Sequence, residues 1–206
     1  PAQAKGLVKR EVVRIVTPGT NLNTNAMDEG KNNYLMSIAY IGGKFGISIA
    51  DVTTGDYYVT EVYSERNVVD EINKFMPSEI ICNHSFLMSG MDIDDLKDRL
   101  SISVFELEEW YFDEDNCEKV LKDHFGIIDL SGLGISEMSL GVIASGSLLK
   151  YLYETQKNSL SHLSKLIPYS TSTFMILDTS TRRNLELCET LREKQKRGSL
   201  LWVLDK

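Results

Sequence analysis

YLMSIAYIGGKFGISIADVTTGDYYVTEVY, residues 34–63, is the stretch that decides the fold of this chain. Phe45, Ile47 and Ile49 alternate with small residues, which is the two-residue period of a strand. Gly42-Gly43 can supply the positive φ angles of a tight hairpin, and residues 53–56 form a second turn. The stretch therefore predicts an antiparallel meander of three strands, at residues 34–41, 45–50 and 57–63.

After the meander the sequence alternates between helical and strand patterns. Val68, Val69, Ile72 and Phe75 have helical spacing, and Gly126 has the position of a helix C-cap. We expect helices at 65–75, 93–100 and 116–125, and strands at 12–16, 79–82 and 101–105. This order predicts an α/β fold with a mixed sheet, as in the ribonuclease-H-like fold.

From residue 137 onward the pattern predicts helices only. A broad apolar stripe over 140–152 contains several small residues, which is typical of a helix buried between neighbours. Residues 156–164 are polar and predict a loop. Leu185, Cys188 and Leu191 form a helical stripe after an apolar run at 174–177. The absence of an initiator Met and an apolar run at 200–204 lead us to expect a piece of a longer protein.

Composition excludes several classes of function. The formal net charge of −8 does not suit a stand-alone DNA-binding domain. The acidic residues gather at 91–118, whereas 181–197 is basic. Cys82, Cys117 and Cys188 are isolated, which argues against disulfides and a zinc site and favours the reducing cytoplasm. No apolar run is long enough to span a membrane, so we expect no membrane partner.

A ribonuclease-H-like fold also raises the hypothesis of a metal-dependent nuclease. Asp51 could be one ligand, with Asp70 or Glu71 as a second, but the next strand offers only Asn83. The ligand set is incomplete, and Asp51 is well explained as a turn former. His84, His124 and His162 have no neighbouring nucleophile, and the aromatic run 110–112 lies among carboxylates, which favours core packing or a protein contact.

Three segments resemble MutS-type DNA mismatch-repair proteins. ILDTSTRRNLEL, at 176–187, is similar to the stretch that opens the lever domain of that family. VKREVVRIVTPGT, at 8–20, is similar to the beginning of the connector domain, and residues 125–149 resemble the passage between the two domains. The resemblance implies a connector domain at 1–130, with a ribonuclease-H-like α/β fold, and the first, truncated part of an all-α lever domain at 131–206.

The resemblance also implies a function. The segment would be a non-catalytic link between the mismatch-reading domain and the lever, clamp and ATPase, and would offer a docking surface to MutL. It would hold no catalytic residue, metal or cofactor, because ATP and Mg²⁺ bind a domain outside it. A second MutS subunit and mismatched DNA would be partners of the parent protein, with little direct DNA contact here. A nuclease and a generic protein-interaction domain remain the alternatives.

Two sets of residues follow from the resemblance as candidate sites. On the helix at 115–124, the outward side chains expected to contact MutL are Glu118, Lys119, Lys122 and Asp123, with Cys117, Leu121 and Phe125 turned inward. Residues 130–139 are the expected joint between the domains. The interdomain and hinge candidates are Gly132, Gly134, Asp178, Arg182, Arg183 and Asn184.

Overall fold

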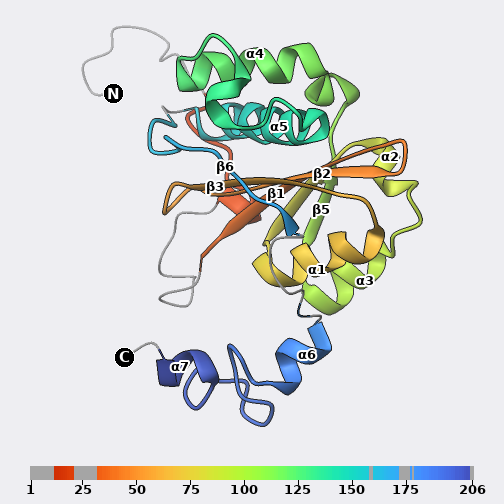
Figure 1. Ribbon diagram of the computed structural model, residues 1–206, viewed down its shortest axis with the longest axis vertical. Helices are drawn as coiled ribbons and strands as arrows, with labels where there is room; N and C mark the ends of the chain where they lie inside the picture. Colours follow the sequence, from red (N-terminus) through yellow and green to blue (C-terminus); the bar gives the residue numbers. More distant parts are fainter. Residues whose placement is uncertain (1–11, 21–31, 158–159, 172–176, 178, 205–206) are drawn as a thin grey trace, which may run out of the picture.

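The computed structural model describes residues 12–20, 32–157, 160–171, 177 and 179–204. Its centre is one mixed sheet of six strands in the order β5-β4-β1-β2-β3-β6. Helices α4 and α5 lie on one side of the sheet and α1 and α3 on the other (Figure 1). The chain therefore has the α/β fold with a mixed sheet that the sequence predicted, and the helices and the sheet form three layers.

The meander forms the middle of the sheet, as predicted. β1 (Tyr34–Ile41) pairs antiparallel with β2 (Lys44–Asp51), which pairs antiparallel with β3 (Asp56–Val62). The first turn has φ angles of 58° and 85° at Gly42 and Gly43, which L residues rarely adopt. β4 (Glu79–Cys82) and β5 (Ser103–Glu106) then extend the sheet parallel to β1.

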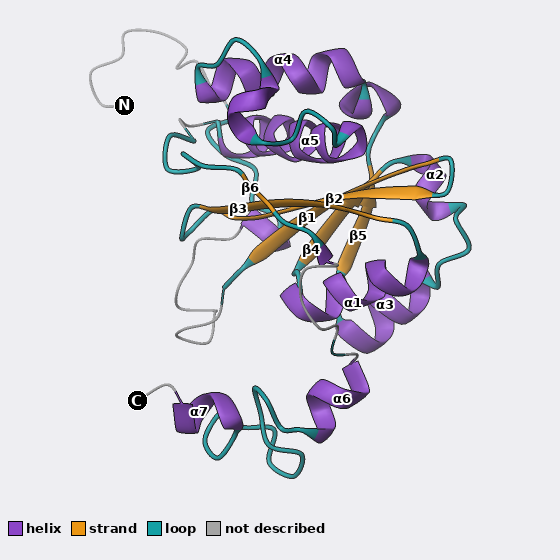
Figure 2. Cartoon of the chain, viewed as in Figure 1, coloured by secondary structure: helices purple, strands orange, loops and turns teal. Residues whose placement is uncertain are grey.

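The helices begin and end close to their predicted limits. Helix α1 (Glu65–Phe75) has Ser64 as its N-cap, and α4 (Glu114–Phe125) begins at the capping side chain of Asp113 and ends at Gly126. The remaining helices on the body are α2 (His84–Leu87), α3 (Ile93–Leu100), α5 (Ser139–Gln156) and the short 3-10 turns η1 (Pro18–Thr20), η3 (Glu109–Phe112) and η4 (Leu130–Leu133). Helices α6 (Thr179–Asn184) and α7 (Leu200–Leu204) lie beyond α1 and α3 from the sheet (Figure 2).

Each face of the sheet carries its own apolar core, because successive residues of a strand point to opposite faces. Leu35 and Ile81 pack with the residues of α5, whereas Met36 and Ile80 pack with Ile72 of α1 and the apolar residues of α3. Helix α5 is buried over most of its circumference, between the sheet and α4. This confirms the prediction of a buried helix over 140–152.

Three predictions about individual elements are wrong. Residues 12–16 are not a strand; their backbone is tied to the body where the Ile15 N–H donates to Thr155 O at 2.7 Å. The chain after residue 137 is not all-helical, because β6 (Ile167–Pro168) pairs parallel with β3. The helix expected to carry the stripe 185–191 ends at Asn184, and the chain continues in turns.

Helix α5 lies on the C-terminal side of the domain boundary that the resemblance implies at residue 130, yet it covers the sheet formed by residues 34–106. The boundary itself stays a prediction. Within the described residues, none of the helices combines the length and the hydropathy needed to cross a lipid bilayer.

Candidate functional site

The described residues contain no group of three or more His, Cys, Asp or Glu side chains placed to hold a metal ion. Asp51 is fully buried and forms the β2–β3 turn: Oδ1 accepts from the Thr53 N–H at 2.7 Å, and Oδ2 accepts from the Asn33 N–H at 3.1 Å. Asn83 caps α2, and its side chain also accepts a hydrogen bond from the Tyr40 N–H and donates one to Tyr40 O. Asp51 and Asn83, two of the side chains named for the nuclease hypothesis, thus have structural partners.

A buried carboxylate fastens the leading segment, residues 12–20, to the body. Glu79, at the start of β4, has no exposed surface. Its Oε2 accepts from the Gly19 N–H at 2.8 Å, and its Oε1 accepts from the Tyr151 hydroxyl of α5 at 2.5 Å. The Asn33 side chain also donates to Pro18 O at 3.0 Å. One side chain therefore joins the leading segment, the sheet and α5.

A second buried carboxylate fastens the trailing segment, residues 166–169. Tyr169 donates its hydroxyl to Oε2 of Glu71 on α1, and its backbone N–H donates to Val59 O at 3.0 Å. Lys74 lies 3.2 Å from the same Glu71 oxygen and 4.3 Å from the centre of the Tyr169 ring. The chain is thus held on the opposite face of the sheet from Tyr151.

The tyrosine hydroxyls in both arrangements stay protonated. Burial is the main cause that raises the pKa of Tyr151, and the neighbouring Glu79 adds to it. Burial is likewise the main cause that raises the pKa of Tyr169, and the neighbouring Glu71 adds to it. A hydroxyl that keeps its proton remains a hydrogen-bond donor to a carboxylate over the whole physiological pH range. A hydroxyl that donates to an ionised carboxylate forms a charge-assisted hydrogen bond, which is stronger than a neutral one.

Helix α4 presents the predicted docking side chains. Lys119 and Asp123 are exposed, while Glu118 and Lys122 are partly exposed and form an ion pair at 2.6 Å. Cys117 and Leu121 are buried and Phe125 is partly buried, as the helical pattern predicted. The four side chains therefore share the outward side of one helix.

Sequence analysis missed the contact that holds η3 onto α5. Lys150 is 9% exposed, and its ammonium donates to Trp110 O at 2.7 Å and Tyr111 O at 3.1 Å. Tyr111 in turn donates its hydroxyl to Glu154. The available signal was a charge inside an apolar pattern, because Lys150 interrupts the apolar stripe of α5.

The expected joint at 130–139 begins with η4, which Asp129 caps through the Ser131 N–H at 2.8 Å. Gly134 ends it with φ of 70°, and Gly132 lies in the same turn. Arg182 in α6 reaches Asn73 O of α1 at 3.4 Å, whereas Arg183 and Asn184 are exposed. Asp178 lies outside the described residues. The described hinge candidates thus lie on two elements, η4 and α6, whereas the docking candidates lie on α4.

Comparison with known proteins identifies the family. Residues 33–164 match the family described as MutS domain II. The chain belongs to this family. Over its whole length it is 61% identical to the DNA mismatch repair protein MutS of Lachnoclostridium phytofermentans, 47% to that of Ruminiclostridium cellulolyticum and 37% to that of Protochlamydia amoebophila. The resemblance seen in residues 8–20, 125–149 and 176–187 is confirmed.

The MutS relatives are much longer than this chain. It spans 22% of the length of the Lachnoclostridium protein and 24% of the other two. The matched segment contains the whole of α5, so the family resemblance extends through the helix that covers the sheet.

Proposed function

We propose that this chain is a non-catalytic coupling segment of a MutS-type mismatch-repair protein, made of the connector domain and the first part of the lever domain. The order β3-β2-β1-β4-β5, with three antiparallel strands followed by two parallel ones, supports the ribonuclease-H-like comparison. The parent protein would act in the cytoplasm on mismatched DNA with a second subunit, and would hold ATP and Mg²⁺ in another domain.

The observation that carries this proposal is that both ends of the sheet body are fastened by buried carboxylates. Glu79 holds the leading segment and Glu71 holds the trailing segment. A displacement of residues 12–20 would move the sheet as a unit, since packed interiors deform little. The sheet would then pass the movement to the following chain through Tyr169. The rigid body would then extend to Tyr169, beyond the boundary expected at residue 130.

The test compares two matched substitutions by residue-resolved hydrogen exchange. Glu79→Gln keeps the side-chain volume but removes the charge that Gly19 and Tyr151 contact, and Glu71→Gln does the same at the trailing segment. We expect Glu79→Gln to accelerate exchange of the Gly19 amide about tenfold, since hydrogen bonds to charged groups contribute roughly 1.5–3 kcal/mol. The Tyr169 amide should keep its rate.

Glu71→Gln should give the reverse pattern, with faster exchange at Tyr169 and an unchanged rate at Gly19. Equal acceleration at both amides in either variant would mean that the carboxylates only contribute to overall stability. No change in either variant would remove the fastening role. Both results would contradict the coupling proposal.

MutL docking is the second part of the proposal, and the shared outward side of α4 supports it. Reversing two charges, Lys119→Glu with Lys122→Glu, should abolish binding of the purified chain to MutL. Lys165→Glu, at an exposed lysine in the loop before β6, is the control. If the double variant binds MutL as well as the wild type does, α4 is not the docking surface. If the wild-type chain also fails to bind, a generic interaction domain becomes the better description.

A further inference from the structure

The outer edge of β5 has free backbone hydrogen-bonding groups. The Ser103 N–H donates to Ser78 O at 3.2 Å, and the Leu107 N–H donates to Cys82 O at 2.9 Å. In a parallel ladder, alternate residues turn both backbone groups to the same neighbour. Val104 and Glu106 must therefore turn theirs away from β4, and β5 ends the strand order, so no strand of the described chain pairs with them.

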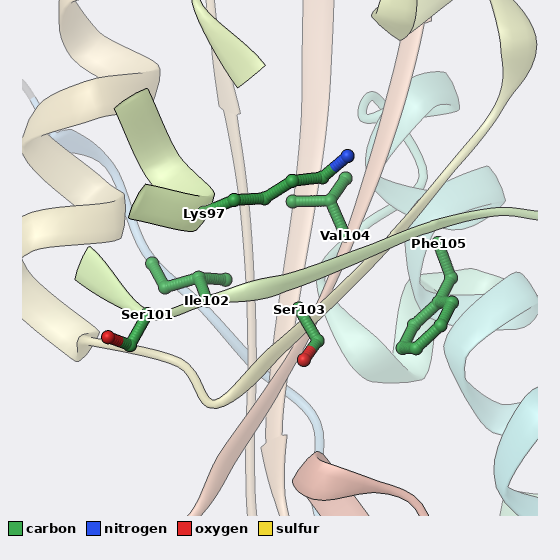
Figure 3. Close-up of a pocket in the computed structure, with 6 residues that line it drawn as sticks. All are labelled: Lys97, Ser101, Ile102, Ser103, Val104 and Phe105. Carbon is green, nitrogen blue, oxygen red and sulfur yellow. The ribbon is translucent and has the colours of Figure 1, made fainter. Parts of the chain in front are cut away.

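This edge is accessible and carries both apolar and charged groups. An open depression runs along it, lined by Lys97 and residues 101–105 (Figure 3). Phe105 is 44% exposed. It pairs with Ile81, whose side chain packs with α5, so Phe105 lies on the α5 face of the sheet. The Lys97 side chain extends beside Val104.

We propose that β5 pairs antiparallel with β5 of a second copy of this chain, around a twofold axis at Phe105. Val104 of one copy would face the partner's Glu106, and each such pair exchanges both of its N–H···O bonds. The two Phe105 rings would then meet in the intervening pair without hydrogen bonds, where side chains approach most closely. The two sheets become one.

The charges near β5 favour a second copy of this chain as the binding partner of this edge. Val104 and Glu106 lie on the same face of β5, since they are two residues apart. Antiparallel pairing around Phe105 places the partner's Glu106 opposite Val104 and so beside Lys97. Glu106 already lies 2.9 Å from Nδ1 of His84 in its own copy, and Lys97 of the second copy would add an ion pair to the same carboxylate, which symmetry repeats. Lys97 would also hinder strands without a matching acid, as edge lysines commonly do.

The contact is small, so the dimer should be weak. A strand of four residues buries far less than the roughly 1,200 Å² of a stable interface. We expect association only at high concentration, with a dissociation constant on the order of 100 μM. A weak dimer calls for a test that traps the predicted register.

Disulfide trapping provides that test. In a Cys188→Ser background, which removes the exposed native thiol, Phe105→Cys should form a covalent dimer under mild oxidation. Facing residues in such a pair have Cα atoms about 4.5 Å apart, within disulfide range. Ser103→Cys is the matched control; it lies on the same face but would be opposite residue 107 of the second copy, so it should stay monomeric.

Charge reversal tests the same register without a covalent bond. Lys97→Glu or Glu106→Lys alone should weaken the dimer about tenfold in sedimentation equilibrium, because each change places like charges at both of the symmetry-related contacts. The two substitutions together should restore the dimer, because they place opposite charges at both contacts again. Equal trapping at positions 103 and 105, or no rescue by the double variant, would overturn the proposal. A chain that remains monomeric at about 1 mM, with no trapping at 105, would overturn it as well.

Discussion

Gly146 sets the distance between α4 and α5. A Cβ atom built there would lie 2.3 Å from the Cys117 Cβ atom and 2.5 Å from its Cα atom. Backbone cannot yield as the end of a flexible side chain can, so Gly146→Ala should lower the free energy of unfolding by about 3 kcal/mol. Urea denaturation measures this change.

Gly132→Ala is the control for that substitution. The nearest atom to a Cβ there is 4.0 Å away, and its φ angle is not in the left-handed region. We expect a change within about 0.5 kcal/mol of zero. A similar loss in both variants would show that the close approach at Cys117 does not limit the packing of α5.

The roles of single residues were the hardest part to predict. The helical pattern correctly separated the buried Cys117 and Leu121 from the exposed Lys119 and Asp123, because they repeat at a fixed spacing. In the sequence, Glu79 is only a polar residue at the start of a short strand. Its contacts could not be predicted, since its partners Gly19 and Tyr151 are far away in the sequence. Long-range contacts of this kind leave no periodic signal.

At the scale of elements, prediction succeeded where the local signal was strong. The Gly42-Gly43 turn, the two-residue alternation and the cap at Gly126 fixed strands and helices to within a few residues. It failed at residues 12–16, where a β-branched run has no neighbouring strand to pair with. It also failed at β6, whose two residues, one of them a proline, become a strand only by pairing with β3.

At the scale of the molecule, the sequence predicted an α/β fold followed by a helical part that begins near residue 137. What the pattern could not show is which way α5 faces. A helix that is apolar all round can pack against either domain, so its periodicity does not decide between them. The structure places α5 against β1 and β2, with Tyr57 donating its hydroxyl to Ser145 O at 2.6 Å.

The central claim is that the sheet and α5 form one body, which moves as a unit. Native-state hydrogen exchange measures this most directly, because cooperative units open with a common free energy. We predict that the slowest amides of α5 and those of β1 and β2 share one opening free energy, equal to that of global unfolding. If α5 instead opens at a free energy lower by about 2 kcal/mol or more while the sheet stays closed, the helix is a separate unit and the account is contradicted.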